Sequence, residues 1–183
     1  MFTILSFLTT TGFESADWQA AQNWSGLETP GLILLGLAMI GGGVATTAGG
    51  VKLLRVYALY LQGLREMERL VHPSSVSASG SKTRRIRRKG ALIAWVFFML
   101  FALSLTAVTL MLTGLGIVFQ DGLVLAISAL STTGPLAQTA VEAPLDILAE
   151  SNAVKYVLSA AMVLGRLETL AIIALLSPNQ WRN

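Results

Sequence analysis

The sequence predicts an all-α membrane protein built from helix–pore loop–helix repeats, one complete and one lacking its first helix. The first observation is composition, because 54% of the 183 residues are hydrophobic and only 13% are charged, against about 25% charged in soluble domains. The second is that the apolar runs have two lengths, one long enough to cross a membrane as a helix and one about half as long. The third is a nine-residue motif that occurs twice, 122 positions apart, each time at the end of a half-length run.

The repeated motif contains Thr-Thr-Gly. Residues 5–13 align with residues 127–135, and five of the nine positions are identical. In each copy a brief apolar run precedes the Thr-Thr-Gly, and an acidic segment and a long apolar run follow it. In a membrane protein, such a repeat indicates one unit used several times about a common axis.

The half-length runs, residues 1–9 and 122–131, are predicted to be re-entrant pore helices. A helix of ten residues covers only ~15 Å, half of the hydrocarbon thickness, so it cannot cross a membrane. Its ends are tolerated there only beside protein or water. The full-length runs are predicted to span, and they cover residues 31–61, 90–118 and 153–177.

The first full-length run is predicted to be broken over residues 41–50, where five of the ten residues are glycine. Each glycine costs a helix about 1 kcal/mol relative to alanine. An unbroken helix over 31–61 would be ~46 Å long, whereas 31–40 and 51–61 alone sum to ~32 Å, close to the ~30 Å core. The alternative is close helix packing through small residues.

The charges predict the topology and three domains. The cluster of basic residues is expected to be cytoplasmic, and the acidic segments 13–30 and 135–154, which contain no base, are expected to be external. Nucleic-acid binding fits poorly between two spans. The parts are an incomplete pore repeat over 1–73, a basic linker over 74–89 and a complete repeat over 90–183. The basic residues are Arg65, Arg69, Lys82, Arg84, Arg85, Arg87, Arg88 and Lys89.

The Thr-Thr-Gly turns are the candidate cation filter. Backbone carbonyls can replace the water shell of a cation, glycine permits the backbone conformations that aim them, and the negative end of the preceding helix favours a positive ion. A glycine-capped helix end is the alternative. The candidate filter residues are Thr10, Thr11, Gly12, Phe13, Thr132, Thr133, Gly134 and Pro135.

Lys52 and Arg166 are the two basic residues predicted to lie within the membrane. Charges at that depth normally face a pore or a partner. Arg166 is therefore expected either to throttle cation flow electrostatically or to clamp a carboxylate between helices. Glu168 is two residues away and lies on another helix face, so it cannot be that carboxylate within the same helix.

These motifs, with Arg65-Glu66, Leu70-Val71-His72-Pro73 and Leu164-Gly165-Arg166-Leu167-Glu168, resemble the Trk/Ktr/HKT superfamily of potassium transporters, in particular its bacterial TrkH-like subunits. The resemblance runs nearly end to end. It implies four pseudo-repeats around one potassium pathway, with the two turns as the third and fourth filter quadrants and Arg166 as a pore arginine. It also implies a gate loop made of Gly41, Gly42, Gly43, Thr46, Thr47, Gly49 and Gly50, followed by Lys52.

The resemblance further implies a membrane homodimer in the bacterial inner membrane and a cytosolic nucleotide-binding regulatory subunit. Half a filter does not encircle an ion, so the chain is expected to be the C-terminal half of a potassium transporter that needs an N-terminal half. The alternative is a non-transporting fragment or assembly subunit. An enzyme is disfavoured, and no cofactor or metal other than transported K⁺ is expected, since the chain has no cysteine and a single histidine, His72, in a charged stretch.

Overall fold

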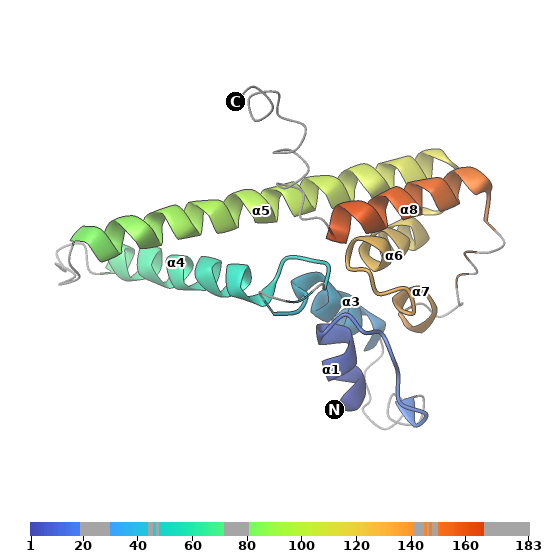
Figure 1. Ribbon diagram of the computed structural model, residues 1–183, viewed down its shortest axis with the longest axis horizontal. Coiled ribbons are helices and arrows are strands. Elements are labelled where there is room, and N and C mark those ends of the chain that lie inside the picture. Colours follow the sequence, from blue (N-terminus) through green and yellow to red (C-terminus); the bar gives the residue numbers. More distant parts are fainter. Residues whose placement is uncertain are drawn as a thin grey trace, which may run out of the picture.

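The computed structural model describes residues 1–18, 30–43, 46, 48–71, 81–140, 145, 147 and 150–166, and within these ranges the protein is all helical (Figure 1). The predicted all-α fold class is therefore confirmed. The helices are α1 (Phe2–Leu8), α3 (Pro30–Ile40), α4 (Leu53–Val71), α5 (Ser81–Gly114), α6 (Phe119–Leu130), α7 (Leu136–Thr139) and α8 (Asn152–Arg166).

Helix α5 is the long axis of the molecule (Figure 1). Its 34 residues correspond to ~51 Å. The apolar part, Gly90–Gly114, has a mean hydropathy of 2.4, and only 17% of its most apolar window is buried inside the protein. Helix α5 is therefore long and apolar enough to cross a bilayer.

The basic segment before Gly90 is helical. Residues 81–89 continue into α5 without interruption, whereas the sequence predicted a linker up to residue 89. The run of arginines and lysines is thus carried on a helical extension of the apolar part of α5. Residues 74–80 of the predicted linker lie outside the described residues.

Helix α6 has half the length that a crossing requires and is enclosed by protein. Its 12 residues span ~18 Å. Gly122 and every residue from Val124 to Leu130 are buried, because α3, α5 and α8 pack around the helix. Such enclosure is the condition under which a short helix is stable at membrane depth.

The described residues between α3 and α4, which are 41–43, 46 and 48–52, are non-helical and lie at the predicted break. Gly41 and Gly50 have φ angles of +68° and +82°, which glycine adopts without a steric penalty. The segment folds back on the end of α3, where the Val51 amide donates to the Met39 carbonyl at 2.9 Å. We refer to residues 41–52 as the glycine loop.

Two apolar clusters hold the helices together, and α6 contributes to both. One joins α5, α6 and α8 and includes Leu112, Leu130 and Leu158. The other joins α1, α3 and α6 and includes Phe7 and Leu34. Helix α4 lies antiparallel to the first half of α5, and α8 lies along the second half (Figure 1). Helix α6 therefore links the N-terminal and C-terminal parts of the chain.

Candidate ion filter and glycine loop

The first predicted filter loop begins where α1 ends in a Schellman turn. The Thr11 amide donates to the Ser6 carbonyl at 2.8 Å, and the Thr10 amide donates to the Phe7 carbonyl at 3.1 Å. Thr10 has a φ of +56°. This pattern of two hydrogen bonds closed by a left-handed residue normally ends a helix at glycine, but here the left-handed residue is threonine.

The second predicted filter loop has the same backbone conformation at the end of α6. The Thr133 amide donates to the Ser128 carbonyl at 2.9 Å, and the Thr132 amide donates to the Ala129 carbonyl at 3.1 Å. Thr132 has a φ of +57°. The repeat seen in the sequence is therefore also a repeat of local structure.

A threonine with a left-handed backbone is strained. The conformation costs an L-residue roughly 1–2 kcal/mol, and for a β-branched residue it is a genuine outlier. Thr10 and Thr132 both adopt it, at equivalent positions of the two motifs. Strain of this kind accumulates at functional sites, so its recurrence favours a functional turn over an ordinary glycine-capped helix end.

The two loops touch each other at Gly12. This glycine is buried, with a φ of +83°, and a Cβ added to it would lie 3.0 Å from both Pro135 Cδ and Thr133 Cγ2. Residues from the two motifs are thus brought side by side. The turns that begin the two loops are equal in conformation, with left-handed Thr10 and Thr132 at equivalent positions.

Gly134, the equivalent of Gly12, has a different environment. A Cβ added there would meet no described atom within 4 Å, and its φ lies outside the left-handed region. Within the described residues, Gly12 is constrained by the neighbouring loop and Gly134 is open.

The glycine loop packs against the end of α6. A Cβ added at Gly49 would collide with the Leu130 carbonyl oxygen and lie 2.6 Å from the Ser131 carbonyl carbon. Gly41 is equally close to the Gly49 carbonyl oxygen. Only glycine allows backbones to approach this closely. The loop consequently lies directly beside the start of the second filter loop.

Lys52 closes the glycine loop. Its Nζ donates to the Thr46 carbonyl at 2.9 Å, and Thr46 Oγ1 donates to the Gly43 carbonyl at 2.6 Å. Lys52 also has a positive φ, +32°. The predicted gate residue Thr47 lies outside the described residues. Of the other predicted gate residues, Gly42 is buried and Gly43 is exposed.

The comparison with protein families agrees with this geometry over nearly the whole chain. Residues 1–182 match the family model TrkH, described as a cation transport protein. The chain belongs to the TrkH family. The recognition made from the sequence motifs is thereby confirmed, and the relatives are transport proteins and not enzymes.

Curated relatives of the chain are potassium uptake proteins from bacteria. It is 32% identical over 182 residues to the Trk system potassium uptake protein TrkH of Salmonella typhimurium. It is 34% identical over 184 residues to TrkH of Halomonas elongata. These alignments cover 99% and 100% of this chain but 36% of each relative, so the chain spans about a third of the length of its TrkH relatives.

The fold matches a solved family member as well. The crystal structure of the potassium transporter TrkH from Vibrio parahaemolyticus superposes with a TM-score of 0.73 and 30% sequence identity. The match covers 97% of this chain and 36% of that one. The helices of this TrkH family member are therefore arranged as in part of a larger transporter.

Arg166 is the last described residue of α8, and its side chain is exposed. The residue before it is held tightly, because a Cβ added at Gly165 would collide with the Leu130 carbonyl oxygen. Arg166 therefore follows directly on a residue that contacts the same end of α6 as Gly49 does. Glu168 and the rest of the predicted helix up to residue 177 lie outside the described residues.

Another basic residue of the predicted spanning runs, Arg55, was not singled out in the sequence analysis. The Arg55 guanidinium lies 3.6 Å from the centroid of the Phe97 ring, joining α4 to α5 by a cation–π contact. It borders a cavity of ≈ 20 Å³ with Phe101 and Gly165, which is large enough for one water molecule. Arg55 follows Lys52 by three positions and lies on the first turn of α4, so the position of Lys52 in the sequence could have pointed to it.

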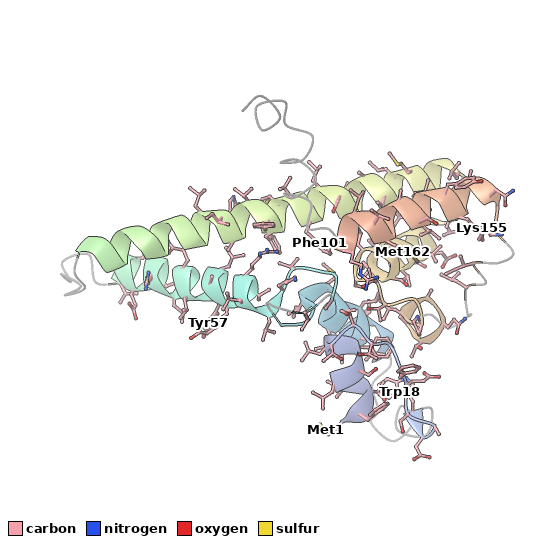
Figure 2. The ribbon with its side chains drawn as sticks, in the orientation of Figure 1. Met1, Trp18, Tyr57, Phe101, Lys155 and Met162 are labelled. Atoms are coloured by element: carbon pink, nitrogen blue, oxygen red, sulfur yellow. The ribbon has the colours of Figure 1, made fainter. Side chains whose placement is uncertain are left out.

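Two side chains labelled in Figure 2 illustrate the outer surface and the interior of the helix bundle. Tyr57 extends from α4 away from α5 and is 56% exposed, whereas Phe101 of α5 is 8% exposed. No group of three His, Asp or Glu side chains suited to a metal exists among the described residues.

Proposed function

We propose that this chain forms two of the four filter quadrants of a potassium transporter, and that K⁺ crosses the membrane between backbone carbonyls of its Thr-Thr-Gly loops. The observation that carries the proposal is the closeness of Gly12 to Thr133 and Pro135, which places side by side two loops that begin with the same helix-ending turn. The names of the relatives, potassium uptake proteins, supply the ion.

The glycine loop is the proposed gate. It touches the Leu130 carbonyl at the start of the second filter loop, and it is closed by the Lys52–Thr46 hydrogen bond. A loop with few side chains can change conformation without repacking a core. Its displacement would change access to the filter while leaving the filter carbonyls in place.

The complete transporter is proposed to be a multi-pass homodimer in the bacterial inner membrane, with the N-terminal portion supplying the other two quadrants. The helical extension of α5 before Gly90 carries six basic residues, and positive charges favour the cytoplasmic side. This extension is the proposed contact for a cytosolic nucleotide-binding regulatory subunit.

A chimera tests the transport proposal directly. This chain replaces the matching C-terminal portion of Vibrio parahaemolyticus TrkH, and the fusion is expressed in bacteria that lack their own potassium uptake. Growth at low K⁺ and rubidium-86 uptake are expected. A chimera that is present in the membrane at normal abundance but takes up no ion would instead support a non-transporting fragment or assembly subunit.

The topology is tested in the same chimera. Tags at Ser79 and Glu142 are expected to be accessible from the cytoplasmic and external sides respectively. Both residues lie outside the described ranges, in the segments that connect α4 to α5 and α7 to α8. Finding both tags on one side would contradict the assignment of α5 as a spanning helix.

A further inference from the structure

We infer that Ser128 is a positioning residue of the fourth filter loop, because it holds the Thr133–Gly134 peptide in one orientation. This inference rests on the proposed function. Ser128 lies in the last turn of α6, and its side chain is only 2% exposed. Its place before the loop, rather than within it, kept it out of the sequence prediction.

Ser128 holds Thr133 at both of its backbone polar groups. The Ser128 carbonyl accepts from the Thr133 amide at 2.9 Å. The Ser128 hydroxyl donates to the Thr133 carbonyl at 2.9 Å and lies 3.4 Å from the Gly134 carbonyl. A peptide held at its carbonyl cannot rotate without breaking that hydrogen bond. A carbonyl oxygen has a second lone pair, so the bond to serine leaves Thr133 able to face an ion.

Burial makes this hydrogen bond important. Thr133 is fully buried, and a hydrogen bond away from water is electrostatically stronger than an exposed one. If the hydroxyl were removed, the Thr133 carbonyl would have to remain unpaired or turn toward another donor. Either outcome changes the orientation or the partial charge that the loop offers to a cation.

The first copy of the motif provides an internal comparison. Ser6 occupies the position equivalent to Ser128, and its carbonyl accepts from the Thr11 amide at 2.8 Å. Its hydroxyl, however, is one of two buried side-chain polar atoms without a hydrogen-bond partner in the described part of the chain. The Thr9 and Thr11 hydroxyls lie 3.0 Å apart and brace that loop instead. The two quadrants are therefore held differently, and only the second depends on the serine hydroxyl.

The experiment uses the TrkH chimera and measures rubidium-86 and sodium-22 uptake for each variant. Ser128→Ala is expected to lower the ratio of rubidium to sodium uptake about fivefold, the equivalent of the ~1 kcal/mol of one hydrogen bond. Ser128→Thr retains the hydroxyl and is expected to restore most of the ratio. A merely structural role would lower abundance and leave the ratio unchanged.

Two further variants serve as comparisons. Ser104→Ala removes another buried serine hydroxyl, one that donates to Phe101 within α5 at 2.8 Å, and is expected to leave the ratio unchanged. Ser6→Ala is expected to change the ratio less than Ser128→Ala. An Ser128→Ala chimera with normal abundance and a normal ratio would overturn the inference, as would an equal effect of Ser6→Ala.

A further variant keeps the inference testable if Ser128→Ala fails to fold. If Ser128→Ala does not accumulate, Ser128→Cys, whose thiol is a weak donor, is measured instead and is expected to lower the ratio. Loss of both variants from the membrane, with Ser104→Ala retained, would show a structural role and overturn the inference. Absence of uptake in the unmutated chimera would contradict the proposed function itself, so the two failures are distinguishable.

Discussion

The backbone of Gly49 lies against the carbonyl oxygen of Leu130, so that not even a methyl group fits between them. Leu130 is the last residue of α6. Gly165 of α8 approaches the same oxygen from another side. The end of α6 is therefore the point at which the glycine loop, the second filter loop and the helix that carries Arg166 meet.

This contact predicts which glycines of the loop matter. Gly49→Ala is expected to displace the loop from α6 and change the ion flux of the chimera, because the new Cβ would collide with the Leu130 carbonyl. Gly43→Ala is the matched control, since its nearest contact would be Thr46 Cγ2 at an ordinary 3.8 Å. Flux and membrane abundance are measured together. Equal flux in the two variants would contradict a gating role for the contact.

Gly12 and Gly134 are expected to respond differently to serine. Gly12→Ser introduces a side chain at a φ of +83° and against Pro135, so it should lower the thermal midpoint of the purified chimera as well as alter its K⁺ over Na⁺ preference. Gly134→Ser meets no described atom and should alter the preference with little loss of stability. Unchanged preference in both variants would remove these loops from the filter.

Thr132→Gly tests the strained turn. Glycine adopts the left-handed conformation without the cost of about 1–2 kcal/mol that threonine incurs, so the variant is expected to be more stable by up to about 1 kcal/mol after the added entropy of the unfolded chain is subtracted. The loop should also be less rigid and less selective. Thermal unfolding and the rubidium-to-sodium uptake ratio check the two effects. A variant that is both less stable and equally selective would refute the assignment of functional strain.

Arg166→Ala distinguishes a throttle from a clamp. If Arg166 faces the ion path, removing its charge should raise K⁺ flux with normal abundance, because a positive charge opposes a nearby cation strongly where the dielectric constant is low. If it clamps a carboxylate, the variant should be lost from the membrane. Arg166→Lys is the control, since it keeps the charge. Normal abundance with normal flux would exclude both roles.

Much of the fold follows from the sequence, because comparing the length of an apolar run with the thickness of a bilayer predicts whether the run is a spanning helix or a shorter re-entrant helix. The uncharged stretch after Gly90 had to span, and the ten-residue run before Thr132 was too short to do so. Five glycines in ten residues predicted the break between α3 and α4. The helical state of the basic residues 81–89 was not evident, because strong charge and a serine-rich neighbour are also typical of a linker.

What the sequence determined by itself is local: the two Thr-Thr-Gly turns, the interrupted helix and the family. Tertiary structure decided which of these parts touch. The contacts of Gly12 with Pro135 and of Gly49 with Leu130 join residues more than 80 positions apart, and no pattern along the chain encodes such a distance. The two copies of the motif also have different surroundings, since the Ser128 hydroxyl donates to the Thr133 carbonyl whereas the Ser6 hydroxyl has no hydrogen-bond partner in the described part of the chain. The physical reason is that packing depends on which helices surround each copy: α6 packs against α3, α5 and α8, whereas the main described neighbour of α1 is α3.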